Sequence, residues 1–172
     1  LDPESGEYKF CYLALITDYY TKEIVGYSVA PTLEAIYAIE ALKMALDHYK
    51  GNDLSQLIHH SDRGVQYASY QYTNLLKQYS IQISMTETGN PKDNAVAERV
   101  NNTIKNELLK DMSFTSISEV LVAVKAAIRF YNEERPHLSL DGLTPREAAK
   151  KRGEINKRWI SYREKAIKAK VA

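Results

Sequence analysis

The apolar positions along the chain follow two different periods, and each period predicts a different kind of element. Residues 8–19 and 23–30 are apolar runs rich in β-branched and aromatic side chains, and the polar residues between them are typical of a hairpin turn. Residues 56–60 and 81–85 are shorter runs of the same kind. The pattern therefore predicts four strands, of which the first two pair as an antiparallel hairpin.

Apolar side chains at helical spacing occur between these strands and through the second half of the chain. The predicted helices cover residues 32–49, 69–79, 93–110, 116–135, a short stretch from 144, and 154–168. Their predicted N-terminal caps are Thr32, Asp93, Ser116 and Thr144. Pro136 ends the long helix, and we expect Arg135 and His137 to reach its last carbonyl groups. Strands that alternate with helices, followed by helices alone, favour an α/β layer with a helical C-terminal part.

Composition narrows the class of protein. The chain has 172 residues, of which 44% are apolar, so it can bury a core without disulfides. Its one cysteine, Cys11, lies among apolar neighbours and is expected in the core, which suits a reducing cytoplasm. No apolar run approaches the roughly 18 residues of a membrane span. The N-terminus lacks a signal peptide and an initiator methionine, so we expect an excised piece of a longer protein.

Charge is distributed unevenly. Residues 143–172 hold ten Lys and Arg against three Glu, whereas residues 1–142 hold thirteen basic and nineteen acidic side chains. A basic C-terminal extension can neutralise nucleic-acid phosphates, although a solvated helix explains the same composition. We therefore expect two parts, a core over 1–142 and a basic helical extension over 143–172.

Asp62 is the first candidate site residue. It directly follows the predicted strand 56–60, and Gly64 allows the backbone there to bend towards a ligand. Ligands of open α/β sheets bind beyond the carboxyl ends of the strands. The alternative is an aspartate that caps a turn through its own backbone.

Glu98 is the second candidate, on the predicted helix 93–110. An apolar stripe on this helix comprises Ala97, Val100, Ile104 and Leu108. Glu98, Asn102 and Lys105 follow at i, i+4 and i+7 and form a separate polar stripe. This stripe can combine a metal-binding carboxylate with groups that meet phosphates, or it can be an ordinary solvated face.

The two acids belong to a longer pattern. Thirty-five residues separate Asp62 from Glu98, and four blocks occur in order: YLALITDYYTKEIVGY, HSDRGVQY, GNPKDNAVAE with Lys105 after it, and YNEERPHLSLDGLTP. In these blocks the chain resembles the integrase core of insertion-sequence transposases and retroviral integrases, the DDE recombinases. The resemblance implies a ribonuclease H-like α/β fold, a mixed sheet flanked by helices with extra C-terminal helices.

The resemblance also implies a reaction. In that family two Asp and one Glu hold two Mg²⁺ or Mn²⁺ ions, and Asp62 and Glu98 match the second Asp and the Glu. The implied activity is metal-dependent DNA nicking followed by transfer of the 3′-hydroxyl ends, on double-stranded transposon ends and target DNA. The implied setting is a homo-oligomer in the bacterial cytoplasm, at the nucleoid.

The expected DNA contacts are Lys105, Asn102, Arg99, Lys92 and Asn94, each of which a surface or capping role would also explain. The first Asp of the family precedes the hairpin, so we expect it upstream of Leu1, with Asp2 and Asp18 as the alternatives within this chain. A chain with two of the three carboxylates should bind metal weakly. Two rival functions stay open: a nuclease of the same fold without strand transfer, and a DNA-binding remnant without activity.

Overall fold

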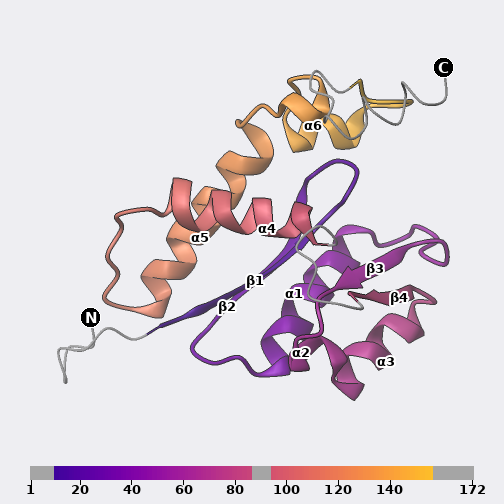
Figure 1. The fold of residues 1–172 in the computed structure, drawn as a ribbon, viewed down its shortest axis with the longest axis horizontal. Helices are drawn as coiled ribbons and strands as arrows, with labels where there is room; N and C mark the ends of the chain where they lie inside the picture. The colour runs from indigo at the N-terminus through magenta and orange to yellow at the C-terminus, as the bar shows by residue number, and fades with distance from the viewer. Residues whose placement is uncertain (1–9, 87–93, 157–172) are drawn as a thin grey trace.

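A computed structural model describes residues 10–86 and 94–156 (Figure 1). Strands β1 (Tyr12–Thr17) and β2 (Ile24–Ala30) form the predicted antiparallel hairpin, in which Leu15 lies opposite Tyr27. The turn between them is closed by a hydrogen bond from the Asp18 amide to the Glu23 carbonyl, 2.8 Å long. The hairpin prediction is confirmed.

Strands β3 (Ile58–Ser61) and β4 (Gln82–Met85) pair in parallel. Helix α2 (Val65–Ala68) and helix α3 (Tyr70–Gln78) connect them. The sequence predicted α3 but not the short α2. In the structure Ser69 caps α3 by accepting a hydrogen bond from the Tyr72 amide. Within the described residues the strands form two separate two-stranded sheets, not one continuous mixed sheet.

Helix α1 (Ala35–His48) packs on one face of the hairpin (Figure 1). Gly26 of β2 permits this close approach, because a Cβ atom there would lie 2.1 Å from the Ala41 carbonyl oxygen. The predicted cap was wrong: the helix starts after Glu34, and the Thr32 hydroxyl donates to the Glu34 carboxylate. Between α1, α3 and β4 lies one buried apolar cluster, made of Ala38, Leu42, Leu46, Tyr72, Leu76 and Ile81.

The opposite face of the hairpin is covered by α4 (Ala95–Asn102), the π-helix η1 (Thr103–Leu108) and α5 (Ile117–Glu133). Their apolar stripes meet β1 and β2 in a second cluster of Ile24, Val100, Ile104, Val124, Ala127, Ile128 and Tyr131. The predicted cap Asp93 lies outside the described residues, and α4 has Asn94 at its N-terminal cap position. The predicted single helix 93–110 is thus an α-helix that continues as a π-helix.

The caps of the later helices follow the sequence closely. Ser116 accepts from the Glu119 amide at the start of α5, while the Glu119 carboxylate reaches back to the Thr115 amide and not to Ser116. Helix α6 (Pro145–Lys150) follows the 3₁₀ turn η2 (Leu138–Leu140) and has the complete capping box of Thr144 and Glu147. Of the predicted helix 154–168, residues 154–156 are not helical and the remainder lies outside the described residues. No helix in the described part of the chain is long and apolar enough to cross a bilayer.

The end of α5 is tied to the start of β2. The Asn132 carboxamide donates to the Ile24 carbonyl and accepts from the Ile24 amide, both at 2.9 Å and both buried. Arg146 of α6 places Nη1 2.8 Å from Oε1 of Glu23, whose side chain is 2% exposed. These polar contacts fasten α5 and α6 to the hairpin.

The expected roles of the residues around Pro136 need correction. The Arg135 guanidinium bonds to Glu107 of η1, and the His137 ring packs edge-on against Tyr131. Neither side chain is found at the last carbonyl groups of α5. The helix end is held instead by the Arg135 amide, which donates to the Phe130 carbonyl.

Candidate active site

Asp62 emerges directly from the carboxyl end of β3, as predicted, and its side chain is exposed. One of its carboxylate oxygens, Oδ1, accepts a hydrogen bond of 2.9 Å from the Gly64 amide. The turn-capping alternative is therefore seen in the structure. It does not compete with metal binding, because an ionised carboxylate offers about four lone-pair positions on two oxygens.

Glu98 lies in the first turn of α4 and is exposed. A carboxylate at this position interacts favourably with the unpaired amides of a helix N-terminus. The segment that leads from β4 to α4, residues 87–93, is outside the described residues. In the view of Figure 1 the arrows of β3 and β4 point towards the middle of the molecule, where α4 begins. Among residues 10–86 and 94–156, no group of three or more His, Cys, Asp or Glu side chains is placed to hold a metal ion.

The other candidate residues take several positions. Arg99 is exposed on α4 and Asn94 is half-buried at its cap position. The side-chain oxygen Oδ1 of Asn102 accepts from Nδ2 of Asn106 at 2.7 Å. Lys92 lies outside the described residues. Lys105 is on η1, so the predicted i, i+4, i+7 stripe is interrupted after Asn102 by the change from α-helix to π-helix.

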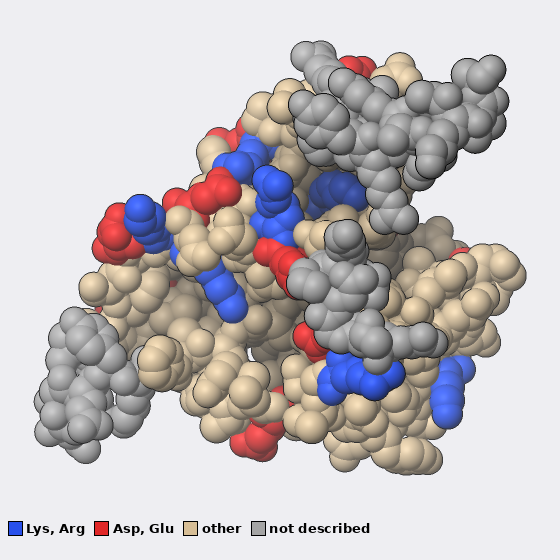
Figure 2. All heavy atoms as spheres, viewed as in Figure 1, with Lys and Arg blue, Asp and Glu red and all other residues tan. Residues whose placement is uncertain are grey.

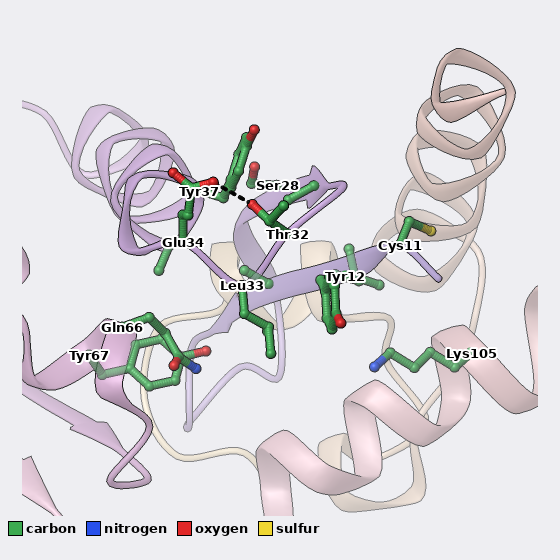
Figure 3. Close-up of a pocket in the computed structure, with 14 residues that line it drawn as sticks. Cys11, Tyr12, Ser28, Thr32, Leu33, Glu34, Tyr37, Gln66, Tyr67 and Lys105 are labelled. Atoms are coloured by element: carbon green, nitrogen blue, oxygen red, sulfur yellow. Dashed lines mark hydrogen bonds between the residues drawn. The ribbon is translucent and has the colours of Figure 1, made fainter. Parts of the chain in front are cut away.

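The side chain of Lys105 lines a cavity of about 180 Å³ that sequence reasoning missed (Figure 3). From β1 come Tyr12 and Ala14 on the face towards α1, and also Leu13, while Cys11 lies just before the strand. The predicted core position of Cys11 was wrong: its side chain is exposed, because the chain enters β1 at the rim of the cavity and not beneath a packed layer. Gln66 and Tyr67 of α2 form another wall. Lys105 reaches the cavity from the helical layer on the other side of the hairpin (Figure 3). The cavity therefore extends around the edge of β1 that faces away from β2.

The sequence held a signal for this open edge. Strand β1 reads YLALIT, apolar on both faces, which is typical of a strand buried inside a sheet. In the structure none of its six residues reaches full burial, whereas five of the seven residues of β2 do. An apolar strand with one unpaired edge is a place where another strand can be added.

The histidines next to Asp62 serve packing. Nε2 of His59 lies 3.1 Å from the Tyr72 hydroxyl, and burial lowers the pKa of His59 to about 4. His60 pairs with the Ser84 hydroxyl of β4 at 2.9 Å. A neutral His59 therefore supports the strand that carries Asp62.

Asp18, one alternative for the first ligand, stabilises the hairpin turn. Its Oδ1 accepts from the Thr21 amide at 2.6 Å and from the Thr21 hydroxyl at 2.9 Å. Its Oδ2 accepts from the Tyr49 hydroxyl at 3.0 Å. These bonds explain the residue without a metal. Asp2, the other alternative, lies outside the described residues.

Comparison with known families and proteins adds independent findings. Residues 2–91 and residues 79–145 each match a family model described as the integrase core domain. The Shigella sonnei insertion element IS600 uncharacterized 31 kDa protein is 38% identical over 135 residues, which are 78% of this chain and 49% of that protein. The putative transposase InsK for insertion sequence element IS150 of Escherichia coli is 37% identical over 136 residues, 79% of this chain and 47% of that protein. The chain thus spans about half the length of these curated relatives.

Solved structures share the fold at low sequence identity. The HTLV-2 integrase catalytic core domain in complex with magnesium is 20% identical, with a TM-score of 0.62, over 82% of this chain and 88% of that chain. A chain of the simian T-cell lymphotropic virus intasome in complex with PP2A regulatory subunit B56 gamma is 17% identical with a TM-score of 0.67, over 87% of this chain and 52% of that one. At this identity the likeness concerns the fold, which is the ribonuclease H-like α/β fold predicted from the sequence.

Proposed function

Because this chain belongs to the integrase core domain family, we propose that it is the catalytic core of a bacterial DNA transposase, which nicks DNA and transfers 3′-hydroxyl ends to a target. One observation carries the proposal. Asp62 leaves the carboxyl end of β3, and Glu98 lies in the first turn of the helix that follows the neighbouring parallel strand β4. Both acids thus belong to segments that leave the same edge of the parallel pair, where α/β proteins bind ligands.

The two carboxylates suit a divalent metal of the kind that this family uses. Mg²⁺ and Mn²⁺ prefer hard oxygen ligands, and both side chains are exposed enough to leave room for metal-bound waters and phosphate oxygens. Asp62 and Glu98 would hold the ions, and the Gly64 amide would orient the Asp62 carboxylate. Bound ions of this kind activate a hydroxyl for attack on phosphorus and stabilise the leaving oxygen. Asp62 and Glu98 would therefore need only to bind and orient the ions, since the reaction requires no covalent nucleophile from the protein.

The third carboxylate of the set is proposed to come from residues upstream of Leu1. We place it on a strand that pairs with the open edge of β1, between β1 and β3. Two features support this placement: β1 is apolar on both faces, and the cavity follows the edge of β1 that has no partner strand in the described part of the chain. Residues 1–142 would then form the catalytic core together with that strand, and residues 143–172 a basic extension.

The proposed DNA contacts are Lys105, Asn102, Arg99, Lys92 and Asn94. Figure 2 shows basic and acidic side chains interspersed over α4, α5 and α6, with no broad basic face in this view. Individual side chains near the acids would therefore position the DNA backbone. The active form is proposed to be a homo-oligomer, because the joining of two transposon ends brings two catalytic cores together.

The test uses a longer form of the protein that includes the upstream residues. Nicking of supercoiled plasmid DNA should require Mg²⁺ or Mn²⁺ and should fall at least about 100-fold in Asp62→Asn and in Glu98→Gln. Asp53→Asn is the matched control. Asp53 is an exposed aspartate that caps a turn by accepting from the Ser55 amide, just as Asp62 does with Gly64, but it lies at the opposite end of β3. Its substitution should leave the rate unchanged.

A second assay separates the rival functions. Oligonucleotides that mimic pre-cleaved transposon ends should be joined to target DNA. Nicking without joining would identify a nuclease, and DNA binding without either reaction would identify a remnant. If Asp62→Asn nicks as fast as the unmodified protein, the site assignment is wrong.

A further inference from the structure

The π-helix η1 changes the direction in which Lys105 points. It continues α4 without a break, and its last bond runs from the Leu109 amide to the Ile104 carbonyl, five residues apart, at 3.0 Å. Each residue of a π-turn advances by a smaller angle than in an α-helix, so Lys105 is rotated off the stripe that Glu98 and Asn102 begin. Its side chain instead reaches the cavity at the edge of β1, opposite Gln66 and Tyr67 (Figure 3).

Polar contacts connect η1 to the end of α5. The Glu107 carboxylate accepts from the Thr103 hydroxyl at 3.3 Å, within the π-turn, and from Nη2 of Arg135 at 2.7 Å. Arg135 directly follows the stretch that Asn132 anchors to β2 through its two buried bonds with Ile24. Hydrogen bonds at Asn132 and at Arg135, with the three-residue step of backbone between them, therefore join the hairpin, the end of α5 and the π-turn.

We infer that Arg135 and Glu107 are positioning residues, which hold the π-turn and thereby direct Lys105 into the cavity beside β1. A π-turn within a helix is rare, so we expect it to persist where contacts from the surrounding structure stabilise it. The Arg135–Glu107 pair supplies such a contact. An effect on DNA binding rests on the proposed function, in which Lys105 contacts a phosphate. The effect of Arg135 and Glu107 on the direction of Lys105 does not depend on that function.

The geometric part can be tested in the 172-residue chain by cross-linking. Cys11 is the one cysteine of the chain, is exposed, and lines the same cavity as Lys105. A short thiol-to-amine cross-linker should join the two side chains, and mass spectrometry measures the yield of that peptide pair relative to all modified Cys11. Lys105→Arg, which lacks a reactive amine, gives the background.

Arg135→Gln and Glu107→Gln should each lower this yield about threefold, as expected when a partly exposed ion pair is lost. The exchange Glu107→Arg with Arg135→Glu should restore it. Arg129→Gln is the control, because Arg129 pairs with Glu133 on the same helix at 3.1 Å without touching η1. An unchanged yield in both single variants overturns the inference, and so does an equal loss in the Arg129 control.

The DNA consequence is measured separately, as duplex affinity against salt concentration. Lys105→Gln should weaken binding and reduce the salt slope by about one phosphate contact. Arg135→Gln should produce part of the same change, and the double variant should be no weaker than Lys105→Gln alone. Weakened binding by Lys105→Gln without any effect of Arg135→Gln overturns the inference. A changed cross-link with DNA affinity insensitive to Lys105 supports the positioning and removes Lys105 from the proposed DNA contacts.

Discussion

The two outer edges of the β-hairpin differ sharply. On the β2 side, the Asn132 carboxamide occupies the edge at Ile24 and satisfies both of its backbone groups. On the β1 side, the edge borders the cavity that Lys105, Gln66 and Tyr67 line. Among residues 10–86 and 94–156, the hairpin is thus closed at Ile24 on one side by a side chain and has no paired strand on the other side.

This difference shows how the fold treats backbone polar groups. A buried amide or carbonyl without a partner is costly, so the β2 edge, covered by α5, needs the asparagine. The edge of β1 borders a cavity, and an added strand would meet the requirement there. At Ile24 the β2 edge has its polar groups satisfied within the chain, and the β1 edge is the place where we propose the added strand and its carboxylate.

The largest expected effect comes from breaking the closed edge. Asn132→Ala leaves the buried amide and carbonyl of Ile24 without partners and should lower the free energy of unfolding by about 2–4 kcal/mol. Urea denaturation of the 172-residue chain measures it. Asn106→Ala, which removes an exposed bond to Asn102, should cost less than about 0.5 kcal/mol. Equal losses in the two variants would show that the β2 edge is not specially dependent on Asn132.

The next largest effect is expected from acid, which should lower the free energy of unfolding through two half-buried histidines. Burial and the nearby charge of Arg135 lower the pKa of His137 to about 4, and burial lowers that of His59 to about 4 as well. In the unfolded chain these pKa values are about 6.5, so the unfolded state binds more protons between pH 6.5 and 4. Stability should therefore be retained above about pH 6.5 and fall as the pH drops towards 4, by at most about 1.4 kcal/mol per pH unit for each histidine.

The variant His137→Phe tests the contribution of the closed side. It keeps an aromatic ring against Tyr131 but cannot take up a proton, so the loss of stability between pH 6.5 and 4 should shrink by about half. Denaturation curves at pH 7, 5.5 and 4 would measure the change. An undiminished pH dependence would place the acid sensitivity elsewhere in the molecule.

The smallest effect is expected at the open edge. Tyr12 is 38% exposed beside the cavity, so Tyr12→Ala should cost less than about 1 kcal/mol in the 172-residue chain. In a form extended upstream, the added strand should cover this side chain, and the same substitution should cost clearly more. The comparison needs the unfolding midpoint of each form, measured with and without the substitution. An identical cost in both forms would argue that the upstream residues do not pair with β1.

Local features of the sequence determined much of the secondary structure. The period of the apolar residues predicted the hairpin and both parallel strands. The caps at Ser116 and Thr144 were readable because a cap and its partners lie within a few residues of each other. The position of Asp62 after a strand and of Glu98 early in a helix also followed from the sequence, and the four blocks, two of which contain these acids, indicated the family.

Tertiary structure decided the features that depend on residues far apart in the chain. Asn132 and Ile24 are 108 positions apart, and Arg135 and Glu107 are 28 apart, so no local pattern reveals either pair. The π-turn, the direction of Lys105 and the open edge of β1 likewise depend on contacts between distant segments. Periodicity reports how each segment favours helix or strand, but which polar groups finally meet depends on how the packed layers place their backbones.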